Sequence, residues 1–156
     1  MPTRRTLTFA TLDAAVRDAE HLLAVGYDKA GKWDLGQCCG HLAAWVRFQL
    51  DGFPRIPLHL RPVFWVLRHT VGPGQGRKMA EGAPMKAGLP TLKESEVPPG
   101  DDARRVAELR ETVARWAAHA GHLHPSPALG SATKERYEKV HCVHCAHHLS
   151  FLIPKS

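Results

Sequence analysis

Residues 134–149 read KERYEKVHCVHCAHHL, a stretch without proline or glycine that holds histidines at positions 141, 144, 147 and 148. Thr133 precedes it as a suitable N-cap, and Pro154 follows it where a helix would stop. We therefore predict a helix over residues 133–151. Because successive helical residues are rotated by about 100°, the helical phase determines which histidines share a face.

Three earlier segments have apolar residues at helical spacing and suitable residues at their ends. They cover residues 12–24, 35–50 and 101–120, and a shorter helix is expected after Pro62. We find no convincing strand pattern and no internal repeat. Four main helices in 156 residues predict one all-α domain, residues 1–156, folded as a four-helix bundle.

The second and third main helices are separated by residues 72–100, which are rich in glycine and proline. We expect a long crossover loop here. So long a connection is uncommon in a compact domain and is often a functional loop or a lid. It also allows the flanking helices of the bundle to be non-adjacent.

The charge and cysteine patterns limit the class of protein. The formal net charge is +6, but the cations are scattered, and on residues 101–120 they alternate with glutamate, so we expect no nucleic-acid partner. No secretory signal is visible, and the most apolar stretch, residues 56–67, is too short to span a bilayer, so we expect no membrane partner. The cysteines, Cys38-Cys39 and Cys142-x-x-Cys145, do not form a secreted disulfide framework, which favours the cytoplasm.

The histidines of the last helix are spaced to bind an ion. His144 and His148 lie one turn apart and only about 40° apart in phase, so two imidazoles can reach one metal. His141 falls within about 60° of His144 on the same side, as does Tyr137. His147 points further round, and we expect it to face away from the site.

A third ligand has to come from another helix, as in other helical bundles. His41 is the natural candidate because it lies on the apolar stripe of the helix over residues 35–50. Three histidines plus water is the open arrangement of a catalytic zinc site. The sequence therefore predicts a divalent-metal site of His41, His144 and His148, in which imidazoles suit zinc, nickel, copper or iron.

Other interpretations stay open at this point. The histidines could bond to one another and to backbone without a metal, since each buried imidazole needs a partner. The four cysteines could hold a structural zinc, although the side chains of adjacent Cys38 and Cys39 point about 100° apart on a helix. The Cys142–Cys145 run resembles a redox motif but lacks a βαβ setting. We expect the cysteines to be small buried apolar residues around the site.

Two stretches carry a resemblance to known proteins: Lys32-Trp-Asp-Leu-Gly-Gln37 leading to His41-Leu-Ala43, and His144-Cys-Ala-His-His148-Leu-Ser-Phe-Leu152. They resemble the DinB/YfiT-like superfamily of metalloenzymes, and more narrowly a bacterial branch described as a domain of unknown function. The resemblance covers nearly the whole chain in helix order. It implies an up-down-down-up four-helix bundle with metal ligands at His41, His144 and His148. It also implies nickel or zinc as the metal, and a homodimer.

Characterised members of that superfamily include thiol-dependent transferases and isomerases. The resemblance therefore implies a metal-dependent thiol transferase or hydrolase, with a low-molecular-weight thiol or another small molecule as substrate. Tyr137 and His141 are candidates for a general base. The alternative is a non-catalytic helical module in which the metal or the histidine cluster is structural. A fourth ligand from His141 or Cys145 would favour that module, and an open position facing a pocket would favour the enzyme.

Overall fold

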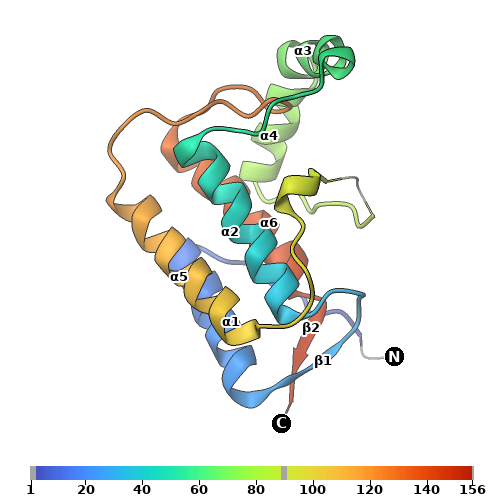
Figure 1. Cartoon of the computed structure of the whole chain (residues 1–156), viewed down its shortest axis with the longest axis vertical. Helices are drawn as coiled ribbons and strands as arrows, with labels where there is room; N and C mark the ends of the chain where they lie inside the picture. Colours follow the sequence, from blue (N-terminus) through green and yellow to red (C-terminus); the bar gives the residue numbers. More distant parts are fainter. Residues whose placement is uncertain (1–2, 89–90, 156) are drawn as a thin grey trace.

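The computed structural model of this chain describes residues 3–88 and 91–155, and it is mostly helical (Figure 1). The four predicted main helices are confirmed to within two residues at each end, and the short helix around Pro62 is also present. The elements are α1 (Leu12–Val25), β1 (Tyr27–Lys29), α2 (Leu35–Asp51), the 3₁₀ helix η1 (Leu58–Leu60), α3 (Arg61–His69), α4 (Gly72–Ala80), the 3₁₀ helix η2 (Lys93–Ser95), α5 (Asp102–Ala118), α6 (Lys134–Leu149) and β2 (Leu152–Pro154).

Polar side chains fix where three of the long helices begin. The hydroxyls of Thr11 and Thr133 accept hydrogen bonds from backbone N–H groups in the first turns of α1 and α6. Asp34 and Gln37 form a reciprocal capping box at the start of α2, in which each side chain accepts from the other residue's backbone N–H. These caps satisfy N–H groups that have no partner inside the helix, so they set the helix boundaries.

The long helices α1, α2, α5 and α6 share one hydrophobic core. Helix α2 packs most extensively against α5, and it also contacts α6 and α1. The largest fully buried side chains come from all four helices, among them Leu22, Leu42, Trp116 and Leu149. This packing places α2 and α6 next to each other, which brings their histidines together.

Two short strands are present where none was predicted. Strands β1 and β2 pair antiparallel, with Tyr27 opposite Pro154 and Lys29 opposite Leu152. Each strand has three residues, which is too short to show the alternating pattern by which a strand is recognised. Their stabilising partner lies at the other end of the sequence, so local sequence carries no signal for the pair.

The prediction that residues 72–100 form one long loop was wrong for the first part of that stretch. Helix α4 occupies Gly72–Ala80, with Pro73 in its first turn, and η2 occupies Lys93–Ser95. Residues 89 and 90 lie outside the described residues. Helix α4 packs against α6, and this tertiary contact overrides the low helix propensity of its three glycines.

Two glycines of α4 give a matched test of this packing. A Cβ at Gly72 would lie 1.8 Å from the carbonyl oxygen of Ala128, whereas a Cβ at Gly74 would meet nothing within 4 Å. Gly72→Ala is therefore expected to destabilise the protein by about 3 kcal/mol through overpacking against backbone. Gly74→Ala is expected to stabilise it by about 0.5 kcal/mol, because alanine loses less backbone entropy in a helix. Urea unfolding of both variants measures the difference, and equal effects would contradict the packing described.

Candidate metal centre

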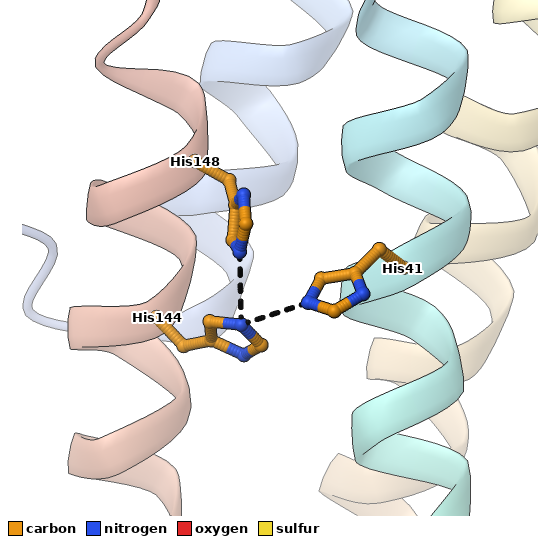
Figure 2. A group of neighbouring side chains, drawn as sticks. All are labelled: His41, His144 and His148. Atoms are coloured by element: carbon orange, nitrogen blue, oxygen red, sulfur yellow. Dashed lines mark hydrogen bonds between the residues drawn. The ribbon is translucent and has the colours of Figure 1, made fainter. Parts of the chain in front are cut away.

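Three histidines from two helices meet between α2 and α6. His41 comes from the middle of α2, and His144 and His148 come from successive turns of α6. Figure 2 shows the three imidazole rings pointing toward one another, with their nitrogens at the centre of the group. The structure thus brings together the three residues that helical spacing selects.

The distances between the ring nitrogens match those of a metal site. The Nε2 atom of His144 lies 3.1 Å from Nε2 of His41 and 3.1 Å from Nε2 of His148. The three ligand atoms all lie within 4.8 Å of one another. In a tetrahedral zinc site with Zn–N bonds of about 2.0–2.1 Å, neighbouring nitrogens are about 3.3 Å apart. The three histidines can therefore hold one ion with little rearrangement.

Hydrogen bonding fixes the tautomer of His41 in the form that a ligand needs. The Nδ1–H of His41 donates to the carbonyl oxygen of Ser95, 3.3 Å away, so in the neutral ring Nε2 carries a lone pair. Nε2 of His144 faces Nε2 of both other histidines. Because a ring nitrogen carries either one hydrogen or one lone pair, it can make a well-directed hydrogen bond to only one of them. Hydrogen bonds alone therefore cannot satisfy all three nitrogens well, whereas a metal ion accepts a lone pair from each.

Two tryptophans hold the histidine rings in place. The indole of Trp33 stacks on the ring of His148, with centroids 5.3 Å apart and an interplanar angle of 10°. The same indole meets the ring of His41 edge-on at 5.0 Å. Trp45, one turn after His41 on α2, lies edge-on to both His41 and His144. These contacts restrict rotation of the imidazoles and so pre-organise the group.

Burial keeps all three imidazoles neutral. It lowers the pKa of His41 to about 4, against the ordinary value of 6.5. The pKa values of His144 and His148 are lowered well below the ordinary value, first by burial and then by the neighbouring histidines. A metal ligand must be deprotonated, so at neutral pH the three rings are ready to bind an ion.

The group opens onto a large cavity. His41, His144 and His148 all line a cavity of about 1010 Å³, whose walls are mostly apolar. The wall includes the rings of Trp33 and Phe53. Other lining residues come from α4 and the segment that follows it, among them Gln75, Met79, Pro84 and Met85. A cavity of this volume is large enough for a small organic molecule.

The two candidates for a general base lie in the cavity wall with their polar atoms engaged. Nε2 of His141 lies 2.7 Å from Oε1 of Gln49, to which it donates as an N–H. Its pKa is lowered to about 4 by burial. The hydroxyl of Tyr137 donates to the carbonyl oxygen of Gly130, 2.6 Å away. Neither residue belongs to the group of converging ligands.

The expectation that His147 faces away was wrong. Its side chain is buried and lines the same cavity as the three-histidine group. Nη2 of Arg4 donates to Nδ1 of His147 across 3.2 Å, and the Arg4 guanidinium lies over the ring of Phe151. The N-terminal segment therefore covers the part of α6 that carries His147.

The four cysteines are free and buried, as predicted, and Cys38 lines the cavity. Burial raises the pKa of Cys38 and of Cys142 to about 12, so both are thiols at neutral pH. A thiolate zinc site needs deprotonated sulfur. In residues 3–88 and 91–155, the three histidines are the group whose ligand atoms converge, and no set of cysteines does so.

Sequence reasoning missed several residues of the site, and only some of them carry a signal. Trp45 and Gln49 follow His41 at intervals of four, so one stripe of α2 faces the cavity and helical spacing could have found it. Ser95 ends the short 3₁₀ helix η2 and Glu96 follows it, and a helix of three residues is too short to give a periodic pattern. Trp33 lies before α2, outside the period of that helix, and packs on two of the histidines.

Comparison with known proteins assigns the chain to a family. A family model described as "Protein of unknown function (DUF1569)" matches residues 1–155, so the chain belongs to that family. This confirms the prediction of a domain of unknown function. No curated protein and no solved structure matches the chain. The function therefore has to be inferred from the site itself.

Proposed function

We propose that this DUF1569 protein is a metal-dependent enzyme in which His41, His144 and His148 hold one divalent ion. The observation that carries the proposal is the convergence of three Nε2 atoms, 3.1 Å from one to the next, on the wall of a large cavity. The bond between His41 Nδ1–H and the Ser95 carbonyl supports it, because such outer contacts orient metal-binding histidines. Zinc and nickel are the ions that we propose.

An open coordination position favours catalysis over a structural role. Within the part of the chain that the structure describes, the converging group has three members, and neither His141 nor Cys145 joins it as a fourth ligand. Structural zinc sites usually have four protein ligands, whereas catalytic sites have three and leave one position for water or substrate. The cavity beside the group gives that position access to a small molecule.

We propose a thiol transferase or hydrolase as the reaction class. A bound divalent ion lowers the pKa of a water or thiol that coordinates it and so supplies a nucleophile near neutral pH. The chain itself provides the apolar walls that hold the substrate's carbon skeleton and exclude water, and it fixes the ligand rings through Trp33 and Trp45. Glu96 lines the cavity and adds a carboxylate to the candidates for a proton acceptor, beside Tyr137 and His141.

We also propose that α1, α2, α5 and α6 form the up-down-down-up four-helix bundle of the DinB-like superfamily. Their shared core supports this arrangement. The ligand pattern supports it too, with one histidine on the second long helix and an H-x-x-x-H pair on the last. The homodimer that the resemblance implies stays a prediction.

Elemental analysis of untagged protein tests the metal site. Wild-type protein is expected to hold about one equivalent of zinc or nickel, and His144→Ala less than about a tenth, because two remaining imidazoles bind weakly. His122→Ala is the matched control, since this exposed histidine lies in the loop before α6. A wild-type protein that holds less than about a tenth of an equivalent, not restored by added zinc or nickel, would contradict the proposal.

Catalysis needs a separate measurement. In a screen of thiols and electrophiles, metal-loaded wild-type protein is expected to transfer a low-molecular-weight thiol to an electrophile or to hydrolyse the electrophile. His144→Ala is expected to show no activity in the same screen. A full equivalent of metal without any turnover would favour the structural module instead.

A further inference from the structure

The exposed apolar side chains of this protein are concentrated in one short segment. Among the described residues, the large hydrophobic side chains in the exposed class include only Leu23 and Val25 outside residues 58–71. The others have exposed fractions between 38% and 76%. They are Leu58, Leu60, Val63, Trp65, Val66 and Val71, which together we term the α3 surface. A concentration of exposed apolar side chains in one segment points to an interaction site.

The α3 surface lies at one end of the molecule, away from the shared core. Helix α3 packs mainly on α4 and η1, and Figure 1 shows it beyond α4, apart from the long helices. Phe64 and Leu67 are half-buried on its inner side. Because successive residues are rotated by about 100°, Val63 and Val66 lie about 60° apart on one side of α3, and both are exposed. The apolar face is therefore directed outward and is not part of the described core.

The segment that carries this surface is also rich in positive charge. Residues 52–80 contain Arg55, Arg61, Arg68, Arg77 and Lys78 and no aspartate or glutamate. None of these five cations forms an ion pair with a residue that the structure describes. Most other arginines of the chain are paired, for example Arg110 with Glu20. The segment thus combines an exposed apolar face with unpaired positive charge.

We propose that the α3 surface binds the interface of an anionic lipid bilayer. A short basic helix with exposed tryptophan and aliphatic side chains lies in the headgroup region, where its apolar face is buried and its cations meet anionic lipid. Trp65, more than half exposed, suits that position. The sequence alone leads us to expect no membrane partner, because no stretch is long enough to span a bilayer. No described helix has the length and apolar character to cross one either, but surface binding requires no such helix. This inference is independent of the proposed metal site.

Charge favours lipid over the other occupants of an apolar face. In a two-fold contact between copies of this chain, the cations of residues 52–80 would face one another without a carboxylate in the segment to pair with them. Nucleic acid would match the charge but leave Val63, Val66 and Leu58 exposed to water. An anionic bilayer satisfies both the charge and the apolar side chains.

Vesicle co-sedimentation of the full chain tests the proposal. Wild-type protein is expected to bind vesicles of equal parts phosphatidylcholine and phosphatidylglycerol and not vesicles of phosphatidylcholine alone. Each cation at such a surface contributes about a fivefold gain in partitioning, so Arg61→Glu, a change of two charges, is expected to weaken binding about 25-fold. Trp65→Ala is expected to weaken it about tenfold through lost apolar burial.

Two control variants and a measurement of the oligomeric state complete the design. Lys139→Glu on α6 and Leu23→Ala on α1 change exposed residues away from the α3 surface and are expected to leave binding unchanged. Failure of wild-type protein to bind anionic vesicles overturns the proposal, and so does equal loss in the controls. If the wild-type protein does not bind vesicles but forms a stable dimer, and Trp65→Ala dissociates that dimer, the α3 surface binds a second copy of the chain and the proposal is overturned. Binding of RNA without binding of vesicles would also overturn the proposal that the α3 surface binds an anionic bilayer.

Discussion

The metal-free protein is expected to lose at least about 3 kcal/mol of its free energy of unfolding when the pH falls from about 7.5 to about 4.5. His141 is buried, and burial lowers its pKa to about 4 from the ordinary value of 6.5. The pKa of His41 is lowered to about 4 for the same reason. In the unfolded chain, His41 and His141 therefore take up protons near pH 6.5, whereas in the folded chain they do so only near pH 4.

The direction of the effect follows from that difference. Above pH 6.5, the ordinary pKa of histidine, both rings are neutral in the folded and in the unfolded state, and the free energy of unfolding has its full value. It falls as the pH drops toward the folded pKa values, because protons then bind preferentially to the unfolded state. His141 alone contributes about 2–3 kcal/mol over this range, at 1.36 kcal/mol for each unit of pKa difference. His144 and His148, whose pKa values are lowered well below the ordinary value, act in the same direction.

Urea unfolding with a chelator present, repeated across this pH range, measures the loss. In His141→Gln the loss is expected to shrink by about 2 kcal/mol, because one group that binds protons on unfolding is gone. Val113→Ala is the control, a buried position on α5 that has no titrating group. It should lower stability equally at every pH. A free energy of unfolding that stays constant between the two pH values would contradict the buried neutral histidines.

Saturating zinc is expected to stabilise the folded protein by about 4 kcal/mol when free zinc is about a thousand times its Kd. The reason is that the three Nε2 atoms converge only in the folded chain, where α2 and α6 lie together. An ion that binds the folded state and not the unfolded state shifts the unfolding equilibrium by mass action. Removal of the ion by a chelator should reverse the gain in full.

Thermal unfolding with and without zinc measures this stabilisation in three proteins. The wild type is expected to show it, and His148→Ala to lose nearly all of it, because one of three ligands is gone. The control His122→Ala removes an exposed histidine and should keep the full effect. Zinc stabilisation that persists in His148→Ala would place the ion elsewhere in the chain.

The core of the site could be predicted from sequence because each helix has a fixed geometry. The four-residue interval between His144 and His148 requires them to share a face of α6. The apolar stripe of α2 then selects His41. These inferences need only the period of a helix and the rule that apolar faces meet.

The parts that escaped prediction depend on contacts between distant segments. Helix α4 forms in a glycine-rich stretch because it packs against α6, and β1 pairs with a strand more than a hundred residues later. His147 is buried because Arg4 and its neighbours cross the end of α6. Local propensity and helical phase contain no information about such partners.

The bond between His41 and Ser95 has a further consequence for the metal centre. Thr91 lines the cavity, and its hydroxyl lies 3.1 Å from the hydroxyl of Ser95, whose carbonyl accepts from His41 Nδ1–H. A molecule that contacts Thr91 in the cavity is therefore connected to a metal ligand through two successive hydrogen bonds. Thermodynamic linkage requires that any effect of cavity occupancy on affinity for the ion equals the effect of the ion on affinity for the occupant.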